Sequence, residues 1–177
     1  MAAVAATIYQ GEGLNVLLRF LPSRCMPAVL RAYGATIGER VRFNAPVTIH
    51  NWDHKRYYRN LRVGDDCYFG RGLFLDLGDV IIIESRVTLS HGVSILTHTD
   101  VGESPLGSAV IPPSRAPVAI RFGAYVGANV TVLQGVDIGE CSAVAASAAV
   151  IRSVPSRTLV AGVPAREKRR LDDRAIE

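Results

Sequence analysis

Apolar residues recur at every sixth position in the second half of the chain. The recurring positions are Ile120, Val126, Val132, Ile138, Val144 and Val150, and a second set follows four places later at Ala124, Val130, Val136, Ser142 and Ala148. A period of six fits neither an amphipathic helix nor a half-buried strand, but it is typical of a solenoid whose short strands each fill one flat wall. Because six is even, side chains return to the same orientation on every wall, which makes the interior predictable.

The same spacing occurs earlier in the chain, in three shorter runs. These are Ile37/Phe43/Ile49, Val63/Phe69/Leu75 and Ile83/Leu89/Ile95. Two interruptions, at about 51–61 and 97–117, are expected to leave the coil as loops, which is where function is usually found. Glycine next to the aliphatic residue, as at Gly127 and Gly139, is expected to permit the corner backbone.

The ends of the chain lack this period. Leu14–Leu21 and Pro27–Tyr33 are predicted as two short helices, so residues 1–34 form an N-terminal helical cap over the first rung. An amphipathic foot on a membrane is the alternative for this segment. Residues 35–165 form the solenoid, and 166–177 form a basic C-terminal tail. The fold class is therefore an all-β solenoid.

The closing segments resemble a known family. Val150-Ile151-Arg152-Ser153-Val154-Pro155, followed by Val160-Ala161-Gly162-Val163-Pro164-Ala165-Arg166, is similar to the hexapeptide-repeat acyltransferases, particularly the sugar O-acetyltransferase and xenobiotic acetyltransferase branch. The resemblance covers about Ala32 to Leu171. It implies a left-handed parallel β-helix, a homotrimer, and acyl-CoA-dependent transfer to a hydroxyl or an amine. The handedness is implied by the family and not by the spacing.

Composition agrees with one compact domain, because 177 residues with 49% apolar content can bury a substantial core. The net charge of +4 is mild, and the dense basic run is Arg166, Lys168, Arg169 and Arg170, which is either a solvated tail or a phosphate contact for CoA. No nucleic-acid partner is expected. The three cysteines have no paired spacing, and neither a secretion signal nor a membrane span is recognised, so a cytoplasmic location is expected.

Acyl transfer needs a base for the acceptor proton, and histidine suits neutral pH. The candidates are His50, His54, His91 and His98. His98 follows a repeat strand where the long interruption begins, as the catalytic histidine of the family does, and is predicted to be the general base. Its structural alternative is a loop histidine that only hydrogen-bonds to the backbone. Asp100 or Glu103 is a candidate to orient the imidazole.

The resemblance also implies a groove between subunits for CoA. Small residues along the wall, at Ala128, Ala145 and Ala146, match the positions where the pantetheine arm would lie, although they also simply satisfy the repeat. Arg152, Arg166 and Arg169 match basic positions near the nucleotide end, where guanidinium groups can bind phosphate.

On the acceptor side, the candidate substrate-binding residues are Asp76, His91, Asp100 and Tyr125. The segment from Gly70 to Asp76 carries glycines where sugar O-acetyltransferases of this type carry asparagines, which puts maltose or galactoside as acceptor in doubt. The first interruption is rich in aromatic and basic residues. It is suited either to an acceptor that carries phosphate or to packing of Trp52 and Tyr58 against another subunit.

The sequence thus predicts a trimeric acetyltransferase that uses acetyl-CoA as co-substrate, without a metal, on a saccharide or similar small acceptor in polysaccharide biosynthesis. One alternative is a zinc protein like the γ-class carbonic anhydrases, but the spacings His50/His54 and His91/His98 do not match its ligand pattern convincingly. The other is an inactive β-helix scaffold.

Overall fold

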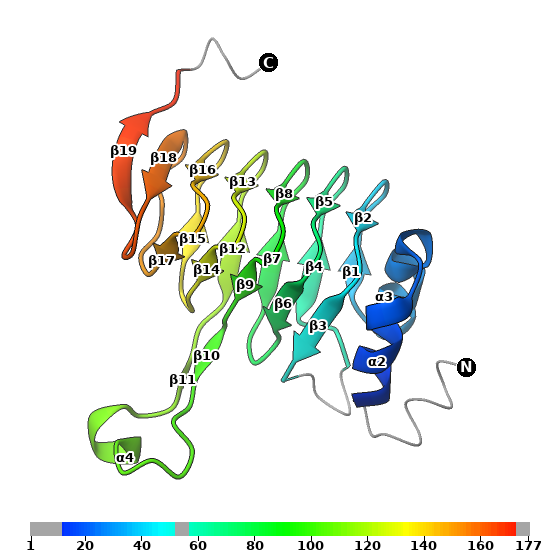
Figure 1. Ribbon diagram of the computed structural model, residues 1–177, viewed down its shortest axis with the longest axis horizontal. Helices are drawn as coiled ribbons and strands as arrows, with labels where there is room; N and C mark the ends of the chain where they lie inside the picture. The colour runs from blue at the N-terminus through cyan, green and yellow to red at the C-terminus, as the bar shows by residue number, and fades with distance from the viewer. Residues whose placement is uncertain (1–11, 52–56, 173–177) are drawn as a thin grey trace.

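The chain winds through three parallel sheets in turn. The computed structural model describes residues 12–51 and 57–172, and Figure 1 shows the strands stacked as successive rungs along one axis. We name the sheets the first, second and third wall, in the order in which each rung visits them. The arrangement is consistent with a left-handed β-helix.

Each wall is built of short strands in parallel register, except that β19 pairs antiparallel with β18 at the end of the second wall. The first wall consists of β1 (Thr36–Ile37), β4 (Leu61–Val63), β7 (Ile81–Ile83), β12 (Val118–Ile120) and β15 (Asp137–Ile138). The second wall consists of β2 (Arg42–Phe43), β5 (Tyr68–Phe69), β8 (Thr88–Leu89), β13 (Tyr125–Val126), β16 (Ala143–Val144), β18 (Thr158–Ala161) and β19 (Arg166–Arg170). The third wall consists of β3 (Val47–His50), β6 (Leu73–Asp76), β9 (Ser94–Ile95), β14 (Thr131–Val132) and β17 (Ala149–Val150).

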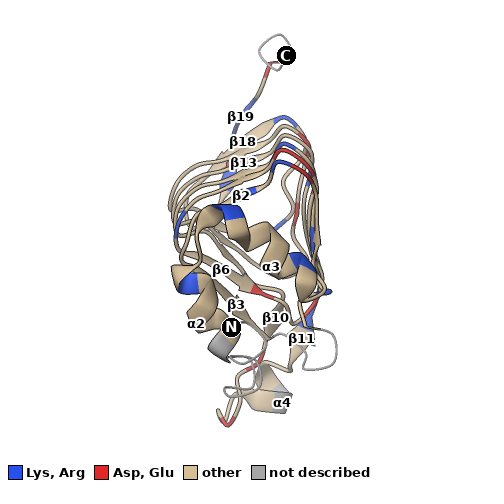
Figure 2. Cartoon of the chain, turned by 90° about the vertical axis from the view of Figure 1, so that its right-hand side faces the viewer, with Lys and Arg blue, Asp and Glu red and all other residues tan. Residues whose placement is uncertain are grey.

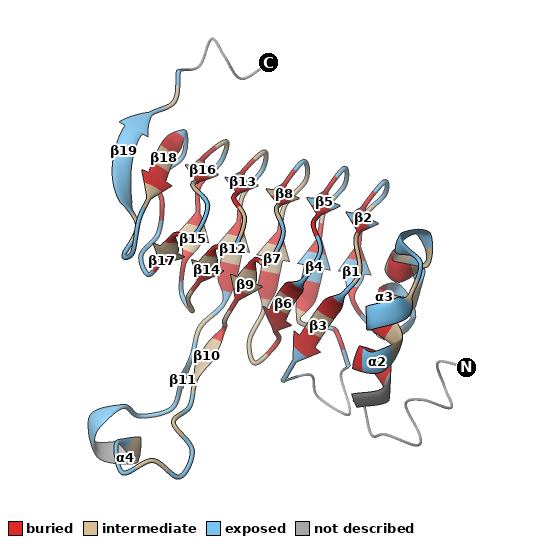
Figure 3. Cartoon of the chain, in the orientation of Figure 1, coloured by how far each residue is buried: buried red, intermediate tan, exposed pale blue. Residues whose placement is uncertain are grey.

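The interior is the one that the period of six predicts. Ile120 pairs in register with Ile138, and Val126 with Val144, so identical positions stack at the strand spacing of about 4.8 Å. All members of both recurring sets are buried, including the polar Ser142. Figure 3 shows this buried interior running the length of the stack, with exposed residues at the corners. The prediction of the core is therefore confirmed.

The corner glycines have a different physical reason from the one expected. Gly127 does not need a positive φ; instead, a Cβ there would lie 2.6 Å from the backbone nitrogen of Ala146 on the next rung. The left-handed conformation falls two residues later, at Asn129 with φ of 56°. Glycine beside the aliphatic residue therefore allows close approach between rungs, and the corner itself turns at the third residue after the aliphatic one.

This distinction predicts a stability difference between two glycine variants. Gly127→Ala is expected to lower the free energy of unfolding by about 1–3 kcal/mol, because the new methyl group must displace backbone of the next rung. Gly107→Ala is the matched control, since the nearest atom to its new Cβ is 4.0 Å away. Urea unfolding followed by circular dichroism measures both. Equal stability of the two variants would contradict this account of the corner.

Two helices pack across the first rung. They are α2 (Glu12–Phe20) and α3 (Met26–Ala32), joined through the 3-10 turn η1 (Ser23–Cys25). Helix α2 contacts β3, and α3 contacts β1 and β2. The side chain of Asn15 donates to Ile49 O at 2.9 Å and accepts from Ile49 N at 3.0 Å, in place of a neighbouring strand. These contacts suit a cap, and the capping role stays a prediction. Within the described ranges, no helix has the length and apolar character needed to cross a bilayer.

The C-terminal segment differs from the predicted tail. Arg166–Arg170 forms β19, which pairs antiparallel with β18 and is exposed along its length. Backbone pairing with β18 and the bonds from Arg170 to Ser156 O (3.0 Å) and Thr158 Oγ1 (2.9 Å) order these residues. Only Leu171 and Asp172 continue beyond this strand in the described chain.

Both interruptions lie where the third wall ends and the next rung begins. The second one forms an arm, residues 98–115, in which β10 (His98–Thr99) pairs antiparallel with β11 (Ser114–Arg115) and the short helix α4 (Gly107–Val110) lies at the far end (Figure 1). In the first interruption, Trp52 and His54 lie outside the described residues. Tyr58 is 1% exposed and packs near Tyr33, with ring centroids 6.2 Å apart. Packing of Tyr58 against another subunit is therefore wrong, because its own chain already buries it.

Charged side chains follow the corner between the first and second walls. Figure 2, which looks along the stack, shows acidic and basic residues gathered along one edge. Arg40 binds Asp66 of the next rung at 2.5 Å, and Arg121 binds both Asp137 and Glu84. The hydrogen bonds to Asp137 and Glu84 raise the pKa of Arg121. These pairs are solvent-accessible, so each contributes little to stability.

Candidate active site

Three polar residues meet at the corner between the third wall and the next rung. Asn51 follows β3, Asp76 ends β6 and His98 begins the arm after β9. Strand β3 pairs in register with β6, and β6 with β9, so these residues come from three successive rungs. Stacking brings them together although 25 residues separate Asn51 from Asp76 and 22 separate Asp76 from His98.

Asp76 is the centre of this cluster and is completely buried. Its Oδ2 accepts hydrogen bonds from His98 Nδ1 at 2.5 Å, Thr97 N at 2.8 Å and His98 N at 3.1 Å. Its Oδ1 accepts from Asn51 Nδ2 at 2.9 Å and Gly78 N at 3.2 Å. Both carboxylate oxygens are thus engaged by donors of the protein itself.

These donors keep the Asp76 carboxyl ionised. Burial alone would raise its pKa, but the hydrogen bonds from His98, Thr97, Asn51 and Gly78 together outweigh burial and hold the pKa below its ordinary value of 3.8. A carboxylate that accepts from Nδ1 fixes the imidazole tautomer with the proton on Nδ1. Nε2 of His98 then carries the lone pair that can accept a proton, and Asn51 Nδ2 lies 3.0 Å from it.

The surrounding residues hold the imidazole in place. Asn51 Nδ2 lies 3.1 Å from Nδ1 and 3.0 Å from Nε2 of His98. A Cβ at Gly78 would lie 3.2 Å from the His98 Cβ, so glycine there leaves room for the histidine. Thr97 is buried, donates to Asp76 O at 2.7 Å and accepts from Asp79 N at 2.8 Å. The His98 side chain keeps 24% of its surface exposed, which leaves it open to a ligand.

A small pocket opens beside the imidazole. Its volume is about 240 Å³, and it is lined by His98, Thr99, Asp100, Pro113, Ser114 and Arg115. All of these residues belong to the two strands of the arm or adjoin them. The arm therefore supplies both the imidazole and one wall of the space in front of it.

Two expectations about carboxylates need correction. Asp76 was expected to contact substrate directly, but it is fully buried and its oxygens are occupied, so it acts on a ligand only through His98. Asp100 or Glu103 was expected to orient the imidazole, but Nδ1 is bound to Asp76. Asp100 Oδ1 instead accepts from Gly102 N at 2.8 Å, which stabilises a turn of the arm. Asp100 still lines the pocket.

Other candidates lie on a different corner. His91, Ala128, Ala145 and Ala146 follow strands of the second wall, so the full width of the third wall separates them from His98 within one chain. His91 Nδ1 accepts from Arg71 N at 3.4 Å. Tyr125 lies on the second wall itself, 47% exposed, and its hydroxyl oxygen accepts from Ser90 Oγ at 3.2 Å.

Of the remaining histidines, His50 lies near the site. Its ring centroid is 6.1 Å from that of His98 and 5.8 Å from that of Phe74. His54 falls outside the described residues. Within residues 12–51 and 57–172, no group of three or more side chains could hold a metal ion.

The predicted phosphate-binding arginines come together in part. Arg152 and Arg166 line one depression of about 220 Å³ at the C-terminal end of the stack, together with Ala165 and Glu167. Arg169 lies elsewhere, opposite Leu159 on β18. Arg152 occupies the same corner as His98, two rungs further along, so an extended ligand of roughly 10 Å or more could reach both positions.

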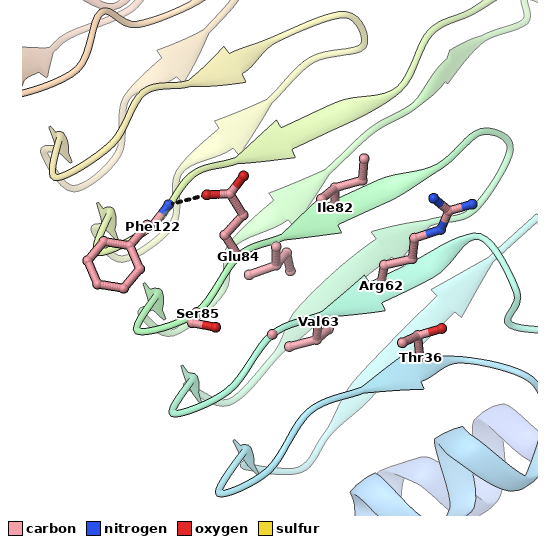
Figure 4. A pocket seen from close by; sticks show the side chains of 9 residues that line it. Thr36, Arg62, Val63, Ile82, Glu84, Ser85 and Phe122 are labelled. Carbon is pink, nitrogen blue, oxygen red and sulfur yellow. Dashed lines mark hydrogen bonds between the residues drawn. The ribbon is translucent and has the colours of Figure 1, made fainter.

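A larger hollow lies on the outer face of the first wall. Figure 4 shows its lining, which includes Thr36, Arg62, Ile82 and Phe122, around a volume of about 440 Å³. Its carboxylate, Glu84, is engaged by Phe122 N at 2.9 Å and by Arg121. Among the described residues that line this hollow there is no histidine, whereas His98 lines the smaller pocket, which is therefore the better candidate site.

Comparison with known proteins shows which proteins this chain resembles. No model of a protein family matches the chain. The chain is 46% identical over 69 residues to the 2,3,4,5-tetrahydropyridine-2,6-dicarboxylate N-acetyltransferase of Enterococcus faecalis, a match that covers 39% of this chain and 30% of that protein. A hexapeptide-repeat-containing acetyltransferase from Vibrio cholerae superposes with a TM-score of 0.80 at 25% identity, covering 98% of this chain and 95% of the other. The relatives are hexapeptide-repeat acetyltransferases.

The matches to hexapeptide-repeat acetyltransferases differ in what they support. The Vibrio cholerae protein has also been solved in complex with acetyl-CoA. A galactoside acetyltransferase in complex with CoA shares the fold, with a TM-score of 0.78 at 22% identity, covering 98% of this chain and 85% of the other. This chain spans about a third of the length of the Enterococcus faecalis relative, so its activity as a whole protein is a matter for proposal.

Sequence reasoning missed Asn51, Gly78 and Thr97. Asn51 was grouped with an aromatic and basic loop, and Gly78 and Thr97 follow repeat strands without a motif of their own. Only their positions within the repeat could have indicated these residues. All three residues lie within two positions after a strand of the third wall, at the corner where His98 also lies.

Proposed function

We propose that this chain is an acetyl-CoA-dependent acetyltransferase that acts on a hydroxyl or amine of a saccharide or similar small acceptor. The observation that carries the proposal is the bond between buried Asp76 and His98 Nδ1, which leaves the Nε2 lone pair to act as a base on a residue that lines a pocket. The relatives include an N-acetyltransferase and the fold neighbours a maltose O-acetyltransferase, so the proposal includes both nitrogen and oxygen as the acceptor atom.

In the proposed reaction, bound acetyl-CoA supplies an activated acetyl thioester. His98 Nε2 accepts the proton from the acceptor hydroxyl or amine as that atom attacks the thioester carbonyl carbon. Asp76 holds the imidazole and stabilises the positive charge that develops on it. His98 then returns the proton to the departing sulfur, so that acetylated acceptor and CoA thiol leave and the enzyme is restored.

The residues predicted to bind CoA lie on two different corners of one chain, which favours a site shared between two copies of the chain. His98 and Arg152 lie on one corner of the chain, whereas Ala128, Ala145 and Ala146 lie on another. If all of them bind one CoA molecule, a second copy must bring its alanine corner against the first copy's histidine corner. We therefore propose a homotrimer of closed, left-handed β-helices with CoA in the grooves between copies. The helical cap, a cytoplasmic location and a part in polysaccharide synthesis belong to the same proposal.

The test measures acetyl-CoA binding and CoA release together. The protein should bind CoA in isothermal titration calorimetry and release free thiol from acetyl-CoA when an acceptor from a panel of sugars, amino sugars and amino acids is added. Replacing both Arg152 and Arg166 with alanine should weaken CoA binding about tenfold to 100-fold, since each loses charge-assisted bonds to phosphate. Arg169→Ala is the matched control on the same strand and should weaken it less, because Arg169 does not line the depression.

Two results would count against these assignments. A protein that neither binds CoA nor releases thiol with any acceptor would refute the proposed activity. Normal CoA affinity in the double variant would refute the phosphate role of Arg152 and Arg166 alone.

A further inference from the structure

Arg115 lies directly across the arm from His98. Strands β10 and β11 are antiparallel, and His98 and Arg115 are paired residues in their register. Side chains of directly opposed residues project to the same face, with Cβ atoms about 4.5–5.5 Å apart. Arg115 therefore stands beside the imidazole over the same pocket, which both residues line.

The guanidinium of Arg115 is available to a ligand. Arg115 is exposed, and across residues 12–51 and 57–172 its guanidinium group has neither a hydrogen-bond partner nor an ion-pair partner. Arg40 and Arg121, by contrast, are paired with acids of neighbouring rungs. An exposed arginine without a partner is ordinary; the distinguishing feature of Arg115 is its position opposite the base.

The rest of the pocket wall is also suited to an oxyanion. Gln134 Nε2 donates to Ser114 Oγ at 2.7 Å, so the hydroxyl hydrogen of Ser114 can itself donate to a ligand. Asp100, the one acid that lines the pocket, accepts from Gly102 N and can accept from a ligand hydroxyl. A guanidinium next to a hydroxyl donor binds carboxylate or phosphate oxygens with directed, charge-assisted bonds.

We propose that the acceptor is an anionic small molecule, whose carboxylate or phosphate group is bound by Arg115 and Ser114 while its hydroxyl or amine faces His98. This inference rests on the proposed function and deepens it, because it names the class of acceptor. The pocket of about 240 Å³ limits the part of the acceptor that lies beside His98 to about the size of one sugar ring. Arg115 is then a specificity-determining residue and not the base.

The experiment compares pairs of ligands that differ in one charged group. The probes are galactose with galacturonate, and glucosamine with glucosamine 6-phosphate, each titrated calorimetrically into the full chain in the presence of CoA. We expect the charged member of at least one pair to bind about tenfold to 100-fold more tightly than the neutral member. The carboxylate pair and the phosphate pair distinguish the two kinds of anion.

Three variants of Arg115 test whether this residue causes the preference for charged ligands. Arg115→Ala should abolish the difference between charged and neutral members, and Arg115→Lys should retain part of it, because lysine keeps the charge without the bidentate geometry. Arg115→Glu should reverse the preference. Arg24→Ala, an exposed arginine in η1 at the opposite end of the stack, is the matched control and should behave as the wild type.

Turnover with the same pairs gives the second readout. An anchoring role predicts that Arg115→Ala raises KM for the charged acceptor with little change for the neutral one. Equal losses of kcat for both acceptors would show that Arg115 acts on the reaction centre, and would overturn the proposal. So would equal binding of charged and neutral members, or equal behaviour of Arg115→Ala and Arg24→Ala. Arg115-dependent binding without any CoA release would instead refute the acetyltransferase activity and leave the anion site standing.

Discussion

Replacing His98 with alanine is expected to lower turnover by roughly 10²- to 10⁴-fold, the usual contribution of general base catalysis. His98 lines the pocket, and its Nδ1 is bound to a buried carboxylate, which leaves Nε2 as the nitrogen that can accept a proton. Without it, water or the acceptor itself must carry the proton. The measurement is the steady-state rate of thiol release at saturating acetyl-CoA.

The control for this variant is Arg24→Ala, which removes an exposed side chain of η1 at the N-terminal end of the stack and should leave the rate as in the wild type. The folded state should persist in His98→Ala, because this side chain is 24% exposed and lies outside the stacked core. A folded His98→Ala protein with an unchanged rate would remove His98 from the mechanism.

Asp76→Asn is the second variant with a large expected effect, again roughly 10²- to 10⁴-fold on kcat. The substitution keeps the shape of the side chain but replaces one carboxylate oxygen with an amide that donates. If this amide faces His98 Nδ1, the imidazole proton moves to Nε2 and the base is lost. CoA affinity should remain, since Asp76 is fully buried and does not line the CoA depression. A normal rate in this variant would show that the tautomer of His98 does not matter.

The same variant also changes stability in a way that depends on pH. Asn at position 76 leaves backbone donors of Thr97, His98 or Gly78 facing an amide, at a cost of about 1–3 kcal/mol at neutral pH. The pKa of Asp76 is lowered in the folded protein, so the contribution of its carboxylate is complete above about 3.8 and is lost as the pH falls through the folded value. The difference in unfolding free energy between wild type and Asp76→Asn should therefore shrink in acid. A difference that stays constant down to pH 2 would contradict this assignment.

The predictable part of the site was a single residue at a break in the repeat. His98 could be singled out because it stands where the third wall ends and a long interruption begins. Asp76 was singled out as a residue that binds the acceptor and not as the partner of His98, because an aspartate at a corner is solvated as often as it is bound. Asp100 and Glu103 are closer to His98 along the chain than Asp76, yet neither is bound to its imidazole in the described chain. Contact across rungs depends on stacking and not on sequence distance.

The sequence by itself determined the walls and the core. Burial and strand alternation act over six residues, so the two recurring sets of positions from Ile120 to Val150 can be recognised in the sequence, and the structure buries every member of them. Only the tertiary structure decided which polar residues share a corner. Rungs separated by some twenty residues of chain lie about 4.8 Å apart, so Asn51, Asp76 and His98 become neighbours while His91 is carried to another corner. Burial of Asp76 and the reason for Gly127 follow from that stacking, whereas the position of Arg115 opposite the imidazole follows from antiparallel pairing within the arm.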